Sequence, residues 1–530
     1  MSLLIDLLRG SNCTLMNKMK KNLQSNILLL PALIAGFFCY LFPILIAFGK
    51  SFFLGTGTDF VGIQNYVDLF ENEAFSLAVR NLFHLWAIIV PVNLVIGIFI
   101  AEVYIKLRKE KLCLFFLVPS ILPAACVVTI ASSILQKSPS QWGETPVAFY
   151  VFLIIVLWKT QGFSILIFIV AIKSIESEII DAAMLDGVNP LQCFWYIKLP
   201  IIKSSLLICG ILTIYNSFRC FREAYLIGGS HPNEQLYSIQ HFLQNNFMNM
   251  NYARLEAASI LVVIFVGAFV LSGMCLARKK EEYLMNPRKE ATYRMLSLIA
   301  AVIFVLPCVF LVFLTFDINP DDLWQMDSLM EFICAYKNTA ILAIAGVLIQ
   351  IVIALPAGYA IARIPSPKAQ TFFLLTCVFF LLLPQQALML PQYLVLMNIG
   401  WLDSLEGLLI MTAFQPWMIL LFWFAAKRID SSLFDSAICD GASNWVLFRK
   451  IYAPIVRPYV MIAAFLSIAE SWNLLEQPMT FLQSKERYPL SMILMQLSTD
   501  NAELKNVLCL LFAVPLMILF CTMVKKIIDT

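Results

Sequence analysis

Long runs of apolar residues alternate with short polar stretches along the whole chain. A helix that crosses a bilayer needs about 20 mainly apolar residues, and twelve runs of this kind occur. The runs are continuous rather than alternating, which favours helices over the strands of a membrane barrel. The expected spans are residues 27–48, 82–105, 112–135, 147–172, 199–218, 257–277, 295–316, 339–362, 371–397, 407–426, 455–473 and 507–524. The pattern predicts an all-α integral membrane protein with 12 transmembrane helices.

Composition and charge support this prediction. Hydrophobic residues make up 60% of the 530 residues and charged residues only 13%, about half the charged share of a soluble domain. Lys and Arg cluster before the first span, between alternate spans and after the last span. Since basic loops stay in the cytoplasm, both termini are expected to be cytoplasmic. The basic residues are Lys18, Lys20, Lys21, Lys106, Arg108, Lys109, Lys111, Arg278, Lys279, Lys280, Arg288, Lys289, Arg294, Arg363, Lys368, Lys525 and Lys526.

The chain reads as two copies of one unit. When the sequence is displaced by 254 residues, segment 161–200 falls on segment 415–454, and fifteen of the 40 positions are identical. The longest charged stretch, residues 278–294, lies midway. We therefore expect a first six-helix half (1–277), a cytoplasmic linker (278–294) and a second six-helix half (295–530). Because each half has an even number of spans, the two repeats are parallel, with their symmetry axis along the membrane normal.

The duplicated block follows the fourth and tenth spans. Residues 181–187 read DAAMLDG and residues 435–441 read DSAICDG, and each copy ends in a proline, Pro200 or Pro454. The pattern predicts a short helix, a turn that glycine permits, a second short helix, and a proline at the start of the next span. One interpretation is an interfacial helix resting on lipid headgroups. The other, which the duplication favours, is a docking element for a cytoplasmic partner.

This block resembles the E-A-A-x3-G-x9-I-x-L-P motif of the membrane subunits of ABC importers. The first copy differs in having Asp181 for Glu, and the second has Asp435, Ser436 and Ala453 at three motif positions. Beyond the motif, residues 61–277 look like one permease of a carbohydrate (maltose-type) importer, and residues 295–530 look like its usual partner permease. The docking residues that the resemblance implies are Asp181, Ala182, Ala183, Asp186, Gly187, Asp435, Ser436, Ala437, Asp440 and Gly441.

The resemblance implies a type I ABC importer permease with its two usual subunits fused, in the cytoplasmic membrane and in contact with lipid. Its partners would be two cytoplasmic ATPase subunits, an extracytoplasmic solute-binding protein and a sugar, with no nucleic acid. ATP and Mg would bind the ATPase subunits, so no cofactor and no enzymatic activity are expected of this chain. Residues Gly49-Lys50-Ser51 resemble the end of a phosphate-binding loop, but position 44 is Ile where that motif requires Gly. The three His residues lack the spacing of metal ligands.

Polar residues inside the spans indicate a substrate pathway, because such residues usually face the interior of a helix bundle. The 254-residue displacement pairs Asn216 with Glu470 and Arg219 with Asn473, and members three apart share a helix face. In maltose-type relatives, residues at or near the positions of Thr160, Phe163, Asn216 and Arg219 contact sugar. Further candidates are Gln161, Gln415 and Trp472.

Other interpretations of these residues stay open. Gln161 and Gln415 could form hydrogen bonds between helices instead of contacting substrate. Arg219 could form an ion pair with Glu470, or it could bind an acidic sugar. A secondary active, ion-coupled transporter of two six-span halves is the alternative function. It predicts coupling carboxylates at the membrane midplane, where Glu470 is the one clear example, and it gives the duplicated loop no role.

Overall fold

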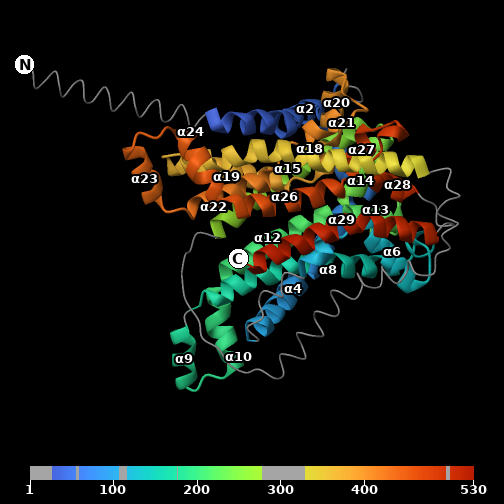
Figure 1. The fold of residues 1–530 in the computed structure, drawn as a ribbon. Coiled ribbons are helices and arrows are strands. Elements are labelled where there is room, and N and C mark those ends of the chain that lie inside the picture. Colours follow the sequence, from blue (N-terminus) through green and yellow to red (C-terminus); the bar gives the residue numbers. More distant parts are fainter. Residues whose placement is uncertain are drawn as a thin grey trace, which may run out of the picture.

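The computed structural model describes residues 27–54, 59–106, 116–175, 177–276, 329–496 and 502–529. These residues form a bundle of helices whose long members run roughly side by side (Figure 1). A single two-stranded antiparallel sheet occurs among them, in which Phe53 pairs with Phe60. The all-α prediction is therefore confirmed for the described part of the chain. The predicted linker 278–294 and the predicted span 295–316 lie outside the described residues.

The first part of the chain comprises η1 (Phe37–Leu41), α2 (Phe42–Lys50), β1 (Phe53–Leu54), β2 (Asp59–Phe60), α3 (Gln64–Phe70), α4 (Glu73–Lys106), α5 (Val118–Ile121), α6 (Ala124–Leu135), α7 (Pro139–Trp142), α8 (Val147–Lys173), α9 (Ser177–Leu185), α10 (Pro190–Cys193), η3 (Phe194–Lys198), α11 (Leu199–Ile201), α12 (Lys203–Arg219), α13 (Phe221–Gly228), α14 (Ile239–Met248) and α15 (Tyr252–Leu276).

The second part comprises α18 (Leu329–Ala362), α19 (Pro367–Leu382), η4 (Gln385–Leu388), α20 (Met389–Ile399), α21 (Leu405–Met411), α22 (Pro416–Lys427), α23 (Ser431–Cys439), α24 (Asn444–Val446), η5 (Leu447–Tyr452), α25 (Ala453–Ile455), α26 (Arg457–Trp472), α27 (Glu476–Phe481), η6 (Lys485–Arg487), α28 (Leu490–Gln496) and α29 (Ala502–Asp529).

Fewer continuous spans are found than the twelve that the sequence predicts. Four helices of the described chain are long and apolar enough to cross a bilayer, namely Ile27–Lys50, Glu73–Ile105, Val147–Lys173 and Met330–Ala362. Four pairs of helices meet the same criterion together but are bent by 47° to 98°, which gives up to eight spans. Two shorter apolar helices, Ala124–Leu135 and Leu508–Phe520, lie within predicted spans. The count of twelve stays a prediction.

The segment predicted to span at 371–397 is not one continuous helix. The chain turns by 98° between Leu382 and Gln385, because Leu383 and Pro384 adopt extended backbone angles and proline cannot continue the helix. Beyond the turn, Gln386 and Gln392 are buried, and Gln392 donates a hydrogen bond to the carbonyl oxygen of Cys39. This segment is therefore a broken or re-entrant element rather than a single helix.

Helix boundaries recur at the displacement that the sequence shows. Helices α9 and α23 begin and end 254 residues apart, and so do α11 and α25. Each of the latter two ends at a kink, at Ile202 or Val456, with nearly the same backbone angles (φ −82° and −86°, ψ 10° and 7°). The next helices, α12 and α26, also begin 254 residues apart. The sequence repeat is thus matched by a repeat of local structure.

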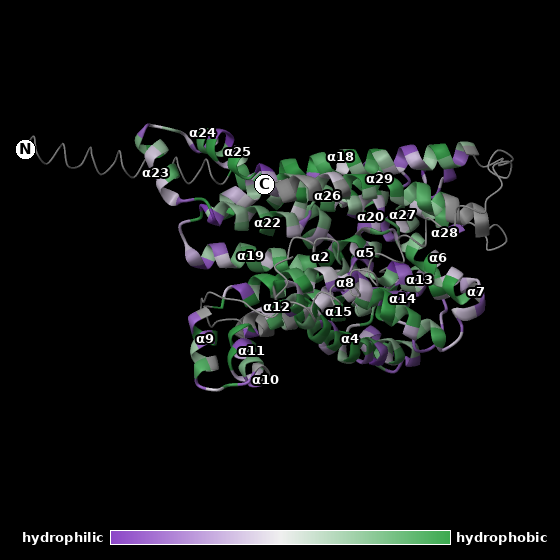
Figure 2. Ribbon diagram, turned by 60° about the horizontal axis from the view of Figure 1, so that its bottom comes forward, coloured by the Kyte–Doolittle hydropathy of each residue, from purple (hydrophilic) through white to green (hydrophobic). Residues whose placement is uncertain are grey.

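The long helices of each part pack closely together. In the first part α4 packs against α8, and in the second α18 packs against α22 and α26. At Gly358 a methyl group would lie 2.5 Å from Cβ of Phe422, so only glycine allows α18 and α22 to approach this closely. Figure 2 shows apolar residues along most of the helices and hydrophilic residues mainly toward the two ends of the bundle. Large apolar side chains such as Val95, Ile154 and Val352 are exposed on its outside, as lipid contact requires.

Candidate functional site

The two predicted docking loops have the same backbone. Each is a nine-residue helix, α9 or α23, followed by a glycine with a left-handed conformation, Gly187 (φ +79°) or Gly441 (φ +82°), and then a second short helix. The predicted helix–turn–helix is therefore confirmed. Both loops project from the same end of the molecule, at the left of Figure 1.

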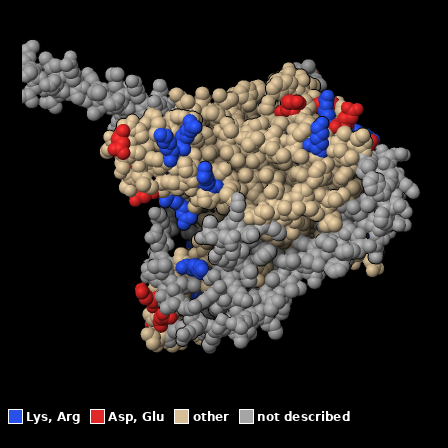
Figure 3. Space-filling model, in the orientation of Figure 1, with Lys and Arg blue, Asp and Glu red and all other residues tan. Residues whose placement is uncertain are grey.

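Most of the predicted docking residues are accessible. In the first loop Asp181, Ala182, Asp186 and Gly187 are exposed, whereas Ala183 is buried; in the second, Asp435, Ser436, Asp440 and Gly441 are exposed and Ala437 is half-buried. Acidic side chains lie at the positions of both loops in Figure 3. Each loop thus offers an acidic, solvent-facing helix to a partner and keeps one alanine turned inward.

The second loop carries a side-chain cap at the start of its helix. The carboxylate of Asp430 accepts a hydrogen bond of 3.0 Å from the backbone N–H of Ser432 at the start of α23. This hydrogen bond lowers the pKa of Asp430 below its ordinary value. The ionised carboxylate sits at the positive end of the helix dipole, which stabilises α23.

The segment after each loop is tied to the long helix of its own half. In the first half Nζ of Lys198 lies 2.6 Å from Oε1 of Glu102 on α4. In the second half the ring of Tyr452 packs at an angle of 46° against that of Tyr359 on α18, with ring centroids 5.0 Å apart, and its hydroxyl donates to the carbonyl oxygen of Phe422 on α22. Movement of either loop is therefore coupled mechanically to a long helix of the bundle.

A cavity of about 240 Å³ lies between the two halves. Its polar wall consists of Ser120, Lys159, Thr160, Asn216, Arg222, Glu223, Glu470 and Asn473. Its apolar wall consists of Ala124, Phe163, Leu212, Tyr215, Cys220, Leu381, Trp417, Leu466 and Ala469. Helices α5, α6, α8, α12 and α13, with Cys220 between the last two, supply the first-half side chains. Helices α19, α22 and α26, with Asn473 directly after α26, supply those of the second half. The mixture of amides, charged groups and aromatic rings suits a polar organic ligand.

A second, smaller cavity of about 100 Å³ adjoins the first. The two share Tyr215, Arg222, Leu381 and Glu470 in their walls. The second cavity continues along Pro384 and Gln385 at the bend after α19, and along Gln415 at the start of α22. The bend that breaks the predicted span 371–397 therefore helps to form this chamber.

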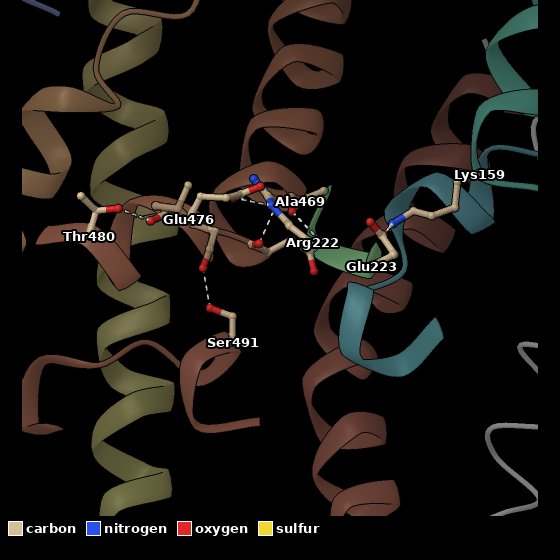
Figure 4. Close-up of polar contacts among 9 residues, drawn as sticks. Lys159, Arg222, Glu223, Ala469, Glu476, Thr480 and Ser491 are labelled. Carbon is tan, nitrogen blue, oxygen red and sulfur yellow. Dashed lines mark hydrogen bonds and ion pairs between the residues drawn. The ribbon is translucent and has the colours of Figure 1, made fainter. Parts of the chain in front are cut away.

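Two buried ion pairs stand beside the cavities, and the sequence did not reveal them (Figure 4). Lys159 of α8 pairs with Glu223 of α13, and Nε of Arg222 lies 2.7 Å from Oε2 of Glu476 on α27. Nη1 of Arg222 also donates to the carbonyl oxygen of Asn473 at 2.7 Å. Two neighbouring residues of α13 therefore form ion pairs in different directions. Glu223 pairs with Lys159 of the first half, and Arg222 pairs with Glu476 of the second half.

Arg222 and Glu476 are 254 residues apart, so they are equivalent positions of the two repeats. The displacement that paired Asn216 with Glu470 could have revealed this pair six residues further along, just past the predicted end of the span. Glu223 and Glu476 are also buried, so Glu470 is not the sole carboxylate in the bundle.

The structure brings together most of the predicted pathway residues. Thr160, Phe163, Asn216, Glu470 and Asn473 line the larger cavity, and Gln415 and Glu470 line the smaller one. The side chain of Arg219 lies outside the described residues, so its expected pairing with Glu470 or with substrate stays a prediction.

Two predicted pathway residues lie elsewhere. Gln161 is buried and donates to the carbonyl oxygen of Asn93 on α4, which is the interhelical hydrogen bond that the sequence left open. Trp472 donates to the carbonyl oxygen of Phe512 and packs against Tyr336 and Phe512. Both side chains therefore serve helix packing rather than the cavity. Among the described residues, no group of three or more His, Cys, Asp or Glu side chains could hold a metal ion.

Comparison with known proteins identifies the domain that carries these features. Residues 93–280 match the family model described as "Binding-protein-dependent transport system inner membrane component". This region is therefore similar to the membrane components of binding-protein-dependent transporters. It includes α8, the first docking loop, α12 and α13. Proteins of this family are membrane transport components, and ATP hydrolysis takes place on separate subunits.

Three curated relatives are similar to about half of the permease. GgtC, an "Osmoprotective compounds uptake permease protein" of Synechocystis, is 25% identical over 44% of this chain and 91% of its own length. AraP of Bacillus subtilis, from an "Arabinooligosaccharides transport system", is 28% identical over 44% of this chain and 82% of its own. MsmF of Streptococcus mutans, from a "Multiple sugar-binding transport system", is 26% identical over 48% of this chain and 94% of its own. Each relative is therefore matched almost fully by less than half of this permease.

Proposed function

We propose that this chain is the transmembrane permease of a bacterial ABC importer that moves a carbohydrate across the cytoplasmic membrane. In this proposal residues 1–277 and 295–530 are two fused permease halves of six spans each, joined by the linker 278–294. Two cytoplasmic ATPase subunits dock at the loops around Gly187 and Gly441, both termini are cytoplasmic, and an extracytoplasmic binding protein delivers the sugar.

The fusion is supported by the agreement between two kinds of repeat. The sequence repeats at 254 residues, and α9, α11 and α12 recur as α23, α25 and α26 at that displacement. The relatives add an independent argument, since each is about half as long as this chain and is matched over most of its length.

The docking role is supported by the placement of the loops. Both project at one end of the bundle, and each presents exposed acidic residues on a nine-residue helix (Figure 1). Each is also fixed to a long helix, through Lys198 and Glu102 or through Tyr452 and Tyr359. A force that an ATPase applied to the loop would therefore reach α4 or α18, which pack against the cavity-lining helices α8, α22 and α26.

The carbohydrate substrate is supported by the cavity and by the relatives. Amides such as Asn216 and Asn473 suit sugar hydroxyls, and rings such as Phe163 and Trp417 suit the apolar face of a sugar. Two of the relatives are named for arabinooligosaccharide and multiple-sugar transport. The single observation that carries the proposal is the duplicated loop, whose first copy lies within the matched residues 93–280.

The test is affinity purification of the tagged chain from native membranes, with mass spectrometry of the proteins that accompany it. The wild-type chain should recover an ABC ATPase and a solute-binding protein. The double variant Gly187→Pro, Gly441→Pro should lose the ATPase at normal membrane abundance, because proline cannot adopt the positive φ of either turn.

Gly400→Pro is the matched control. Gly400 also has a positive φ (+78°) and nothing within 4 Å of an added Cβ, but it follows α20 at the other end of the molecule (Figure 1). This variant should keep the ATPase. Recovery of no ATPase with the wild type, together with sugar uptake that survives ATP depletion but collapses with the proton or sodium gradient, would establish a secondary transporter instead.

A further inference from the structure

The charges around the larger cavity are arranged in pairs. Lys159 is neutralised by Glu223, and Arg222 by Glu476. An anionic ligand would have to compete with a carboxylate for a cation that is already paired, which is costly in a low-dielectric site. The described charges therefore favour a ligand without net charge.

Two side chains of the cavity wall carry a buried polar atom that has no hydrogen-bond partner within the described chain. These atoms are Oε2 of Glu223 and Nε1 of Trp417. Glu223 is 1% exposed, and its other carboxylate oxygen is held by Lys159. A buried polar atom without a partner costs roughly 1–3 kcal/mol, so a ligand that supplies the missing partner gains binding energy. One atom needs a donor and the other needs an acceptor, and a hydroxyl group offers both.

Trp417 and Glu223 come from opposite halves of the chain. Trp417 lies in the first turn of α22, and Glu223 lies in α13. The rings of Phe163 and Tyr215 complete an aromatic wall. The cavity volume of about 240 Å³ is below the roughly 300–1,000 Å³ of sites that take drug-sized ligands, so the cavity suits a small ligand such as one or two sugar rings.

We infer that this cavity binds an uncharged sugar unit in transit and that Glu223 and Trp417 determine its specificity, the former accepting a hydrogen bond from a hydroxyl and the latter donating one. The inference rests on the proposed function. It extends that function by naming the substrate class, one or two neutral sugar rings, and by giving the second half of the chain a direct part in recognition.

The first experiment is binding to the purified full chain in nanodiscs, without a binding protein, so that only the cavity selects. Equilibrium dialysis would use radiolabelled arabinobiose and maltose as neutral probes and digalacturonate as the acidic one. At least one neutral probe should bind, and digalacturonate should bind at least tenfold more weakly. Preferential binding of digalacturonate, or binding of none of the three probes, would overturn the inference.

The second experiment uses a matched pair of tryptophan variants. Trp417→Phe keeps an aromatic ring and removes only the indole N–H, so affinity for the neutral probe should fall about three- to tenfold. Trp423→Phe is the control, since Trp423 lies in the same helix, also has a buried N–H without a partner among the described residues, and does not line either cavity. Equal effects of the two variants would contradict a role of Trp417 in binding.

The third variant is Glu223→Gln. It retains the shape of the side chain and an oxygen for Lys159, but its NH2 group cannot accept a hydrogen bond from a ligand hydroxyl. Affinity for the neutral probe should fall by a similar three- to tenfold at normal membrane abundance, whereas unchanged affinity would remove Glu223 from the site. The proposed function is judged separately by uptake. Uptake that does not require ATP would refute it, whereas ATP-driven uptake that Trp417→Phe and Glu223→Gln leave unchanged would refute only this inference.

Discussion

In the first half of the chain an ion pair, Lys198 with Glu102, fixes the segment after the docking loop to α4. In the second half, an aromatic contact between Tyr452 and Tyr359 fixes the same segment to α18, and a buried hydrogen bond from the Tyr452 hydroxyl to the carbonyl oxygen of Phe422 fixes it to α22. Lys198 and Tyr452 are equivalent positions of the two repeats, 254 residues apart. Glu102 and Tyr359 are also equivalent, at the displacement of 257 residues that aligns Asn81 with Asn338. The repeat therefore preserves where the segment is attached but not the chemistry that attaches it.

A second pair of equivalent positions shows why the halves benefit from being different. Arg222 and Glu476 occupy the same place in the two repeats and face each other across the interface. If both halves carried arginine there, two buried cations would meet, and two glutamates would repel in the same way. Opposite charges favour pairing of unlike halves and oppose pairing of two identical ones. Divergence at this position thus makes the interface specific.

The largest expected effect comes from breaking this contact between the halves. Arg222→Met should lower the stability of the chain by about 3–5 kcal/mol, because it leaves Glu476 buried without its cation. Arg222→Glu alone should be worse, and the exchange Arg222→Glu with Glu476→Arg should recover most of the loss. The measurement is the midpoint of thermal unfolding of the purified chain in nanodiscs.

The control for this prediction is the more exposed ion pair between Arg487 and Asp403. The side chain of Arg487 is 49% exposed and lies 2.9 Å from Asp403, so Arg487→Met should cost no more than about 1 kcal/mol. If both arginine variants had equally small effects, Arg222 and Glu476 would not hold the halves together, and the argument about unlike halves would fail.

The next effect compares the two attachments directly. Lys198→Met should cost about 1–3 kcal/mol, because Glu102, only 14% exposed, loses its cation. Tyr452→Phe keeps the ring contact with Tyr359 and loses only the hydrogen bond to Phe422, so it should cost about 0.5–1.5 kcal/mol. Adding Glu102→Gln should rescue Lys198→Met and leave Tyr452→Phe unchanged. A larger loss for the tyrosine variant would show that the aromatic attachment depends mainly on its hydroxyl group.

Local structure at the repeat was largely predictable from the sequence. The identical residues of segments 161–200 and 415–454 located the docking loops, and the glycines at 187 and 441 located their turns. These features depend on neighbouring residues alone. Five of the pathway predictions also line the larger cavity, since polar side chains on one face of a transmembrane helix must turn toward the bundle interior.

Features that depend on the fold as a whole were missed. Hydropathy averaged over about twenty residues cannot register the 98° bend at Pro384, because the residues on both sides of it are apolar. Arg222, Glu223 and Glu476 lie just beyond predicted spans, and the sequence gives no sign that their charges are buried and paired. Trp472 was predicted to line the substrate pathway because it is close in sequence to polar pathway residues, but its ring packs against Phe512 instead.

The most local expected effect tests the feature that the halves share. Gly187→Ala and Gly441→Ala should each destabilise their loop by about 1–2 kcal/mol, the cost of placing a Cβ at positive φ. The two losses should be equal, because φ is +79° and +82° and neither position has an atom within 4 Å of an added Cβ. Hydrogen exchange of α9 and α23 measures the loss locally. Gly49→Ala, in helix α2 with equal space around it, should instead be neutral or stabilising. Unequal losses in the two loops would show that their different attachments to α4 and α18 already constrain the turns differently.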